Sequence, residues 1–377
     1  MMSDSVQTTF LVNNKRYLES LMGDRRYRRL IKLHPVLRRI LASYERSCDD
    51  VEKNAALVNL FNSLEGTLYW RFDKWNCAVI EDRDLKRKYG NQRTRIDYSD
   101  PSVKDYYSVA VILKNEARYL REYILFYKAT GADRLYLYDN DSTDNIMEVI
   151  DPFVKEGFVV YQKWPGKIVQ QAAYRNVIRK TRSRTKWLAI VDSDEFLFSP
   201  LGNMKEQLKA YEAYPGIGVN WRVYGPNGHD KRPPGLIMDN YTTTIADSDE
   251  TVNRHIKSIV QPKKVFTTFH THYVIYKRHK YAVDETKNNI DNTNAFYANA
   301  GKAFTAHNHG DVFRINHYFT KSLEDLRVKC ARGYADGAPN RNFEEALAYI
   351  DHPLAEDKTI LVYADIVRGM YEQYKKD

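Results

Sequence analysis

This 377-residue sequence has few cysteines, no long apolar run and none of the common glycine-rich phosphate-binding motifs. Its three cysteines are far apart and form no Cys-x-x-Cys pair, so neither a zinc site nor a disulfide framework is predicted. No apolar run approaches the roughly 20 residues of a membrane-spanning helix, and the polar start MMSDSVQTTF is unlike a signal peptide. We therefore expect a cytoplasmic protein with reduced thiols.

The missing glycine motifs exclude two nucleotide-binding classes. No Gly-x-Gly-x-x-Gly follows the first predicted strand, and the P-loop pattern occurs nowhere in the chain. A Rossmann dinucleotide site and a P-loop nucleotide site are therefore not expected. At 43% hydrophobic residues the chain is still long enough to bury a full core.

Residues 1–100 are predicted to form a mainly helical, basic region. Between Leu21 and Arg46, arginine and lysine alternate with aliphatic residues at helical spacing, and Pro35 divides the segment. One interpretation is a packing helix with a solvated basic face. The other is attachment to an anionic membrane surface, which would place the protein at the inner face of the membrane. The net charge of +9 is moderate, and no nucleic-acid partner is expected.

Strands and helices are predicted to alternate within residues 101–335. The predicted strands are 109–113, 133–140, 158–164, 187–191 and 217–224, and the predicted helices are 116–130, 144–156, 170–181 and 204–214. This alternation predicts an α/β domain whose mainly parallel sheet carries helices on both faces. Residues 336–377 are predicted to be a C-terminal helical extension. In such sheets, ligands bind outside the carboxyl ends of the strands.

The stretch KWLAIVDSDEFLFSP places acidic residues at such an end. An apolar run of strand length delivers Asp192, Asp194 and Glu195 and is followed by further apolar residues. Carboxylates this close repel one another, so a divalent cation, Mg²⁺ or Mn²⁺, is their simplest partner. On the same reasoning, removing Asp194 is expected to relieve repulsion in the metal-free protein. The alternative interpretation is a solvated acidic turn after a core strand.

Polar residues also follow the first two predicted strands. They are Lys114, Asn115, Glu116, Asp139, Asn140 and Ser142. Together with the carboxylates they favour a nucleotide that is bound by amide and carboxylate groups, with its diphosphate on a metal.

The sequence resembles a known family at this point. The runs VAVILKNEARYLREYILFYKATGADRLYLYDNDSTDN, QQAAYRNVIRKT and KWLAIVDSDEFLF are similar to the nucleotide-binding half of GT-A fold glycosyltransferases. Specifically they resemble glycosyltransferase family 92 and its bacterial relatives in the family 2-like group. Downstream runs such as INHYFTKSLEDLRVKCARG agree, and the resemblance covers residues 106–333. The GT-A fold is thus the expected architecture.

The resemblance implies a metal-dependent hexosyltransferase of polysaccharide biosynthesis. The donor would be a nucleotide sugar linked to uridine diphosphate (UDP), with UDP-galactose as a candidate. The acceptor would be a glycan or a lipid-linked glycan, and the transfer would invert the anomeric centre. Asp139 would bind uracil or ribose, with Lys114 and Asn115 beside it.

Metal and phosphate roles follow from the same resemblance. The candidate metal ligands are Asp192, Asp194 and His317, with Asp192 facing ribose or a metal-bound water. Trp221 is a candidate platform on which a sugar stacks, and Arg175 is a candidate to hold Asp192 or a phosphate. The candidates for binding the diphosphate or an anionic acceptor are Lys257, Lys321, Lys329 and Arg332. Each of them has a plain alternative, as a solvated charge or a core side chain. His270 and His272 alternate across a predicted strand, so only one should face the site.

Inversion needs a carboxylate that accepts the proton of the acceptor hydroxyl. Asp239 is ranked first for this role, and Asp230 and Glu195 are the other candidates; a retaining enzyme would need none of them. Two other functions stay open. One is a nucleotidyltransferase that makes nucleotide sugars, and the other is a non-catalytic protein that binds nucleic acid or membranes through its basic region.

Overall fold

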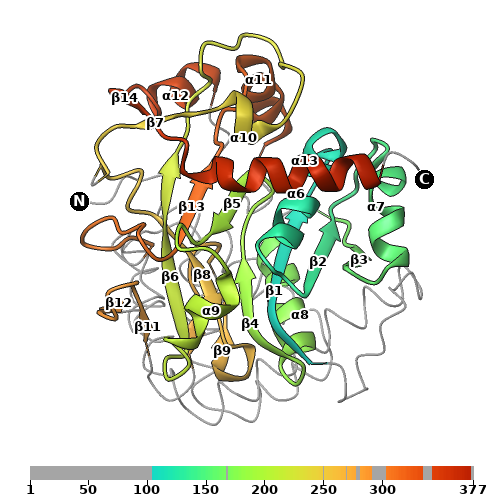
Figure 1. Cartoon of the computed structure of the whole chain (residues 1–377), viewed down its shortest axis with the longest axis vertical. Coiled ribbons are helices and arrows are strands. Elements are labelled where there is room, and N and C mark those ends of the chain that lie inside the picture. Colours follow the sequence, from blue (N-terminus) through green and yellow to red (C-terminus); the bar gives the residue numbers. More distant parts are fainter. Residues whose placement is uncertain are drawn as a thin grey trace, which may run out of the picture.

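The computed structural model describes residues 104–166, 169–248, 250–268, 270–276, 281–290, 303–333 and 342–374. The predicted basic region 1–100, including the segment 21–46, lies outside them. Figure 1 shows the arrangement of the described elements around a central sheet. In this part of the chain, no helix combines the length and the apolar character needed to cross a membrane.

Four parallel strands form one half of the sheet. They are β1 (Asp105–Leu113), β2 (Arg134–Asp139), β3 (Val159–Lys163) and β4 (Thr185–Ile190), in the spatial order β3-β2-β1-β4. The crossovers contain α6 (Ala117–Ala129), α7 (Ile146–Lys155) and α8 (Gln170–Thr181). These seven elements confirm the prediction, although β1 begins at Asp105 rather than Val109.

The other half of the sheet is mixed. β8 (Ile256–Val260) pairs antiparallel with β4 and with β6 (Gly216–Val223), so β6 runs parallel to β4. The remaining strands here are β5 (Glu195–Phe198), β11 (Ala282–Val283), β12 (Asn289–Ile290) and β13 (Arg314–His317). The sequence predicted β6 but not β8 or β13, which lie outside the local alternation of strands and helices. The antiparallel β8 also separates this strand order from the dinucleotide-binding order 3-2-1-4-5-6.

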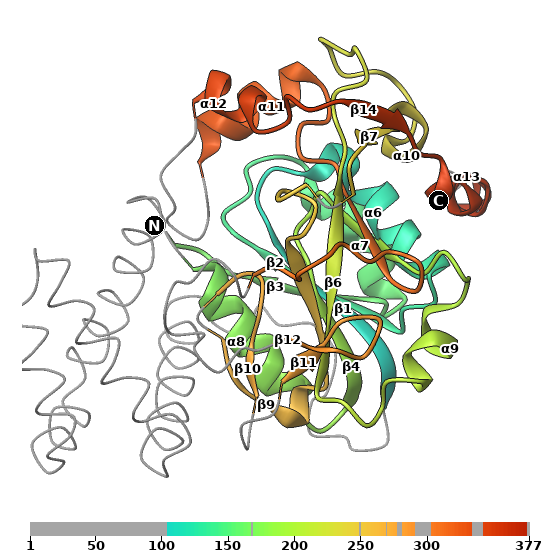
Figure 2. The same cartoon turned by 90° about the vertical axis from the view of Figure 1, so that its left-hand side faces the viewer.

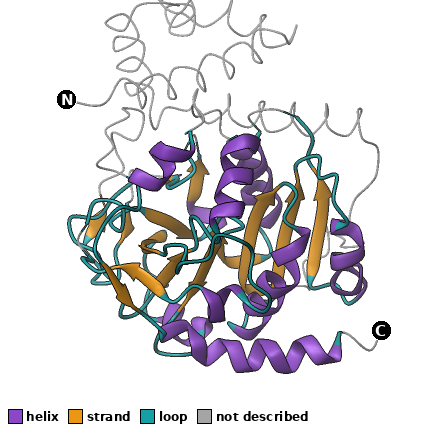
Figure 3. Ribbon diagram, turned by 90° about the horizontal axis from the view of Figure 1, so that it is seen from above, coloured by secondary structure: helices purple, strands orange, loops and turns teal. Residues whose placement is uncertain are grey.

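The sheet has a hydrophobic core on each face. On β1, Tyr107, Val109 and Val111 belong to one core, whereas Ala110 and Ile112 belong to the other. Buried residues of α6 and α7 complete the first core, and buried residues of α8 complete the second. Figure 2 shows α8 on the opposite side of the sheet from α6, and Figure 3 shows helices flanking the strands. The predicted α/β class, mainly parallel with helices on both faces, is therefore confirmed.

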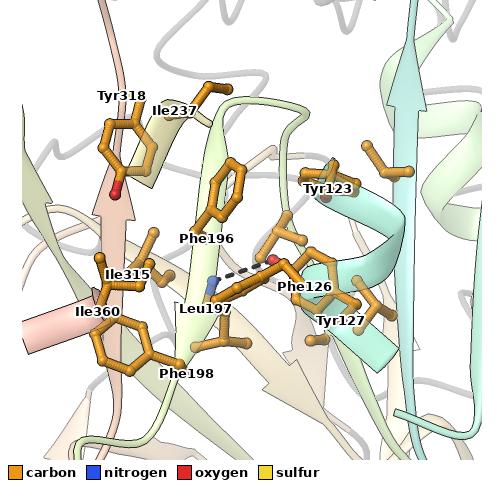
Figure 4. Packing of buried hydrophobic residues seen from close by; sticks show 14 of the residues in the cluster. Tyr123, Phe126, Tyr127, Phe196, Leu197, Phe198, Ile237, Ile315, Tyr318 and Ile360 are labelled. Atoms are coloured by element: carbon orange, nitrogen blue, oxygen red, sulfur yellow. Dashed lines mark hydrogen bonds between the residues drawn. The ribbon is translucent and has the colours of Figure 1, made fainter. Parts of the chain in front are cut away.

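The strand that follows the acidic residues is fixed by aromatic packing. The Phe196 ring on β5 lies 4.8 Å from the Phe126 ring and 5.1 Å from the Tyr318 ring, measured between centroids. The Tyr127 hydroxyl donates to the Glu195 carbonyl at 2.8 Å and accepts from the Leu197 N–H at 3.1 Å. Figure 4 shows this packing and the bond to Leu197. The backbone beside the acidic residues is thus held by buried side chains.

Short elements lie beyond the carboxyl ends of the strands, at the top of Figure 1. They are α10 (Ile237–Asn240), α11 (Leu323–Arg332), α12 (Phe343–Ala348) and the antiparallel pair β7 (Thr243–Ile245) and β14 (Leu354–Glu356). α13 (Val362–Gln373) packs against α6, while α9 (Met204–Lys209) is shorter than the predicted helix 204–214. The small pair β9 (Val265–Thr267) and β10 (Ile275–Tyr276) follows β8, after a 3₁₀ turn at Pro262–Lys264.

Candidate active site

The loops after β1 and β2 are joined by their polar side chains. Asn115 has a positive φ of 56°, its N–H donates to the Ser142 hydroxyl at 3.0 Å, and its side-chain oxygen accepts from the Thr143 N–H at 2.7 Å. Asp139 accepts from the Ser142 N–H at 2.9 Å and from the Tyr161 hydroxyl at 2.8 Å. A positive φ, as at Asn115, is uncommon in residues other than glycine and is often found at functional sites. The structure therefore brings Asn115, Asp139 and Ser142 together, as the sequence predicted.

Asn140 has a local role in this region. Its amide nitrogen donates to the carbonyls of Trp164 and Gly166, at 3.0 and 2.9 Å. These bonds tie the end of β2 to the loop after β3. Asn140 thus shapes the loops beside Asp139, and both donor bonds of its amide are used within the protein.

Asp192 is partly exposed, with its side chain 32% accessible, and its carboxylate is bound by buried side chains. One of its carboxylate oxygens accepts from Gln170 and from the Tyr174 hydroxyl, both at 2.9 Å, and the other accepts from the Lys257 ammonium at 2.7 Å. Glu195 is fully buried and accepts from the Asp192 N–H at 2.8 Å. Both oxygens of Asp192 therefore have protein donors, and its side chain is held in one position.

Lys257 compensates two of the carboxylates. Its side chain is 1% exposed, and its ammonium lies 2.7 Å from Asp192 and 3.7 Å from Glu195. Burial would lower the pKa of Lys257, but Asp192 and Glu195 together raise it. Burial raises the pKa of Glu195 well above its usual value despite the opposing effect of Lys257. Lys257 is therefore a structural partner of the acidic turn as well as a donor-site candidate.

Asp194 faces a different set of partners. Its Oδ2 lies 2.7 Å from the Lys329 ammonium on α11 and 3.7 Å from Nε2 of His317 on β13. Burial by itself would raise the pKa of Asp194, but Lys329 and His317 outweigh it and hold that pKa well below its usual range. The pKa of His317 is lowered by burial, so its imidazole is neutral near pH 7. The structure thus joins Asp194 and His317, which are distant in the sequence.

Glu116 forms a third charged group at this edge of the sheet. It pairs with Lys321 at 3.1 Å and with Arg332 at 2.7 Å, and Arg332 also donates to the Lys114 carbonyl. Burial would raise the pKa of Glu116, but these two cations lower it. The predicted candidates Lys114, Glu116, Lys321 and Arg332 are therefore neighbours. Four basic side chains, Lys257, Lys329, Lys321 and Arg332, thus lie within ion-pair distance of Asp192, Asp194, Glu195 or Glu116.

The donor atoms at Asp194 fit a divalent metal ion. A carboxylate oxygen and a neutral imidazole nitrogen suit Mn²⁺, and a separation of 3.7 Å lets both reach one ion. Nδ1 of His317 is buried and has no hydrogen-bond partner, so no bond at that atom fixes the ring tautomer. Across the described residues, no group of three or more His, Cys, Asp or Glu side chains has the geometry to hold a metal. Asp194 and His317 would therefore supply two ligands, with the others coming from water or phosphate oxygens.

Trp221 is buried among imidazoles. It is 6% exposed, and its ring lies 4.8 Å from the His255 ring and 4.2 Å from the His317 ring. Little of the indole is left for stacking on a sugar, so the structure gives Trp221 a packing position instead of the predicted platform. The indole Nε1 is buried and has no hydrogen-bond partner.

The prediction for the two neighbouring histidines was wrong in its geometry. Residues 270–272 form a bend rather than a strand, and the rings of His270 and His272 are 5.2 Å apart. Burial lowers the pKa of His270 to about 4 and lowers that of His272 well below its usual value. Arg175 points toward the same segment and donates to the Thr268 carbonyl at 3.3 Å.

The three carboxylates considered as the base lie in different surroundings. Asp239 on α10 pairs with Arg368 of α13 at 2.6 Å, and its side chain is 36% exposed. Asp230 is exposed, in a loop whose backbone accepts from the N–H groups of Leu323 and Glu324 at the start of α11. Glu195 alone belongs to the buried acidic network.

Glu122 holds the base of α10 and was not singled out from the sequence. This residue of α6 is buried, and its two oxygens accept from the N–H groups of Ile237 and Met238 at 2.7 and 3.1 Å. Burial raises the pKa of Glu122 to about 8, although the two backbone bonds oppose this. A carboxyl group that is neutral near pH 7 thus anchors α10, the short helix that carries Asp239.

Glu122 should make the stability of the protein depend on pH. The unfolded carboxyl loses its proton near its model value of 4.5 and the folded one near 8, so the free energy of unfolding should fall across this window as pH rises. The slope from this group is at most about 1.4 kcal/mol per pH unit. Glu122→Gln should remove this component, so its stability relative to wild type should be higher at about pH 8 than at about pH 5. Urea unfolding of both proteins across that range measures it; parallel pH profiles would contradict the assignment.

Two further residues of the network were missed. Gln170 and Tyr174 lie four residues apart on α8 and both bind Asp192. Two polar groups at this spacing, on a helix face otherwise formed by residues such as Ala173 and Val177, are a recognisable signal of a buried polar contact.

Comparison with known proteins identifies relatives over this same region. The model of glycosyltransferase family 92 matches residues 107–325, more than half of the chain. A family 92 protein of Oryza sativa subsp. japonica is 34% identical over 160 residues, which are 41% of this chain and 26% of that protein. A family 92 protein of Arabidopsis thaliana is 27% identical over 192 residues, 48% of this chain and 32% of that protein. The chain thus spans less than a third of the length of these relatives.

Solved structures of TarS from S. aureus are also similar to this chain. The complex with UDP-GlcNAc has 15% sequence identity and a TM-score of 0.27, and the match covers 42% of this chain and 45% of that one. The complex with UDP has 11% identity and a TM-score of 0.32, and covers 65% and 70% of the two chains.

Proposed function

Because this chain belongs to glycosyltransferase family 92, we propose that it transfers a sugar from a nucleotide sugar to a hydroxyl group of an acceptor. The observation that carries the proposal is the position of Asp194. Asp194 follows the carboxyl end of the parallel strand β4, within the residues 107–325 that match the family. Its Oδ2 atom faces both Lys329 and His317. Ligands of α/β sheets bind at this edge.

The nucleotide is proposed to bind over the loops after β1 and β2. Asn115, Asp139 and Ser142 are joined there by hydrogen bonds, so the surface that they form is organised before a ligand arrives. Preorganised polar groups bind a ligand without a further cost of ordering side chains. UDP is the proposed nucleotide, with UDP-galactose as the first donor to test.

The diphosphate is proposed to lie between the cations of the same edge. Lys321 and Arg332 can turn from Glu116 toward phosphate oxygens, and Asp194 with His317 would hold Mn²⁺ or Mg²⁺. Such an ion supplies positive charge to the leaving diphosphate, where negative charge grows in the transition state. Asp192, which is held in place by Lys257, would face the ribose.

The reaction is proposed to invert the anomeric carbon. The acceptor oxygen attacks this carbon, the bond to the diphosphate oxygen breaks, and UDP leaves with the bonding electrons. A carboxylate takes the hydroxyl proton. We assign this role to Asp230 ahead of Asp239, because Asp239 pairs with Arg368 and Glu195 is fully buried. The acceptor is proposed to be a glycan or a lipid-linked glycan.

A donor panel tests the proposal. The full chain should release UDP from one UDP-sugar in the presence of Mn²⁺, slowly to water and faster with an acceptor, and release should stop when the metal is chelated. Nucleoside diphosphate release is measured by chromatography. His317→Ala should need a Mn²⁺ concentration roughly 10-fold higher for half-maximal release, since one proposed ligand is lost.

The same panel separates the alternatives. A nucleotidyltransferase would release pyrophosphate from a nucleoside triphosphate and a sugar phosphate, and a binding protein would release neither product. Absence of nucleoside diphosphate from every sugar donor, in the presence and absence of acceptors, would sink the proposal.

A further inference from the structure

Lys329 occupies the place where a cation is needed at Asp194. Its ammonium donates to Asp194 Oδ2 at 2.7 Å and to the Phe319 carbonyl at 3.0 Å, and it lies 4.1 Å from the centroid of the Phe319 ring. An ammonium ion over an aromatic ring gains a further electrostatic attraction. Lys329 is thus held by three contacts.

This ammonium and a metal ion would require the same oxygen. Asp194 Oδ2 is also the atom that faces His317 Nε2 at 3.7 Å, so an ion bound between Asp194 and His317 would use it. Two positive charges on one carboxylate oxygen repel each other. Metal binding and the Lys329–Asp194 ion pair should therefore exclude each other.

The lysine can leave without unfolding its helix. α11 is fixed at its first turn by a capping box between Ser322 and Asp325, and Asp325 also pairs with Arg232 at 2.6 Å. Arg332 ties the last turn to Glu116. The Lys329 side chain is 21% exposed and has a flexible four-carbon stem, so a rotation about its own bonds suffices to move the ammonium.

We propose that Lys329 neutralises Asp194 in the donor-free protein and that its ammonium transfers to the diphosphate of the donor when a divalent ion takes its place. This inference rests on the proposed function and adds an exchange of cations on one carboxylate. Lys321 and Arg332 lie at the same edge, so the released ammonium joins existing positive charge where the diphosphate is expected. The negative charge of Asp194 is then balanced both before and after the donor binds, first by Lys329 and then by the divalent ion.

The exchange predicts that replacing Lys329 strengthens the binding of Mn²⁺ and weakens the binding of UDP. In Lys329→Met the competitor for Asp194 is gone, so Mn²⁺ should bind the nucleotide-free protein about 10-fold more tightly, as seen by electron paramagnetic resonance of free Mn²⁺. In the same variant, UDP should bind about 10-fold more weakly at saturating Mn²⁺, measured by calorimetry, because a phosphate partner is lost.

Two further variants serve as controls. Lys155→Met removes an exposed lysine that pairs with Asp151 on α7, and it should change neither affinity. Lys329→Arg keeps a positive charge near Asp194 and should show Mn²⁺ affinity close to that of wild type. If Lys329→Met does not fold, as judged by circular dichroism, Lys329→Gln takes its place.

Each other outcome overturns the inference. Mn²⁺ affinity that falls or stays unchanged in Lys329→Met would make Lys329 a fixed structural or phosphate-binding residue. Failure of both proteins to bind Mn²⁺ would remove the exchange as well. Neither result touches sugar transfer, since the donor panel measures nucleoside diphosphate release independently; only a negative panel would remove the proposed function.

Discussion

Asp194→Ala is expected to lower the rate of nucleoside diphosphate release by at least about 100-fold at saturating Mn²⁺. The substitution removes the one carboxylate oxygen that faces both His317 and Lys329. Charge that develops on the leaving diphosphate would lose its metal, and this loss acts on the transition state more than on the bound substrate. Steady-state rates at several Mn²⁺ concentrations measure the effect.

The structure reverses the stability expected for this variant. Repulsion among the acidic residues predicts that Asp194→Ala stabilises the metal-free protein, but Asp194 is compensated by Lys329 at 2.7 Å. Its removal leaves an ammonium that is 21% exposed without its carboxylate, at a cost of about 1 kcal/mol. Chemical unfolding should therefore show a small loss of stability.

The dependence on pH provides a control for that explanation. The folded pKa of Asp194 is lowered, so the ion pair contributes fully above the unfolded pKa of about 3.9 and is lost as pH falls through the folded value. Wild type should lose this contribution in acid and Asp194→Ala should not.

Turnover close to that of wild type in Asp194→Ala would remove the residue as a metal ligand.

Lys257→Met is expected to be the most destabilising single substitution at the site. Lys257 is 1% exposed and is the cation nearest to Asp192 and Glu195. Its replacement by an apolar side chain of similar length leaves the Asp192 carboxylate without its ammonium partner. Glu195 contributes less to the loss, because burial already raises its pKa well above the usual value. Breaking a buried ion pair costs about 3 to 5 kcal/mol. Asp192 is 32% exposed, so a loss at the lower end of this range is expected, and urea unfolding near pH 7 measures it.

A double variant tests whether charge or packing causes the loss. Lys257→Met combined with Asp192→Asn removes the ammonium together with its closest carboxylate, so it should recover a substantial part of the lost stability. The surface variant Lys155→Met should stay close to wild type. A Lys257→Met protein as stable as wild type would show that the acidic turn needs no cation.

The parallel half of the fold could be predicted because its signals are local. Strands β1 to β4 are apolar runs of strand length, and α6 to α8 have buried residues at helical spacing. β8 could not be placed in the same way. Its antiparallel position between β4 and β6 depends on where the chain returns after β7, and no local pattern encodes that path.

In the candidate site, too, the features that depend on local sequence could be predicted and the long-range contacts could not. The proximity of Asn115 and Ser142 was expected, because the two residues follow neighbouring parallel strands. The hydrogen bond between them was not predicted. Tyr174 as a partner of Asp192 and Glu122 as an anchor of α10 were not predicted, because the groups that they bind are 18 and 115 residues away in the sequence and are brought close only by the fold.

The sequence by itself determined the order of strands and helices in the parallel half of the sheet and the position of Asp192 and Asp194 at a strand end. Hydrophobic periodicity and burial of an apolar run are properties of neighbouring residues, so they can be recognised without a structure. Only the tertiary structure decided which cation meets which carboxylate. Lys257 is 65 residues from Asp192 and Lys329 is 135 residues from Asp194, and both distances are closed by the pairing of β8 with β4 and the seating of α11. Charge pairs of this kind depend on separation in space, which residue spacing along the chain does not specify.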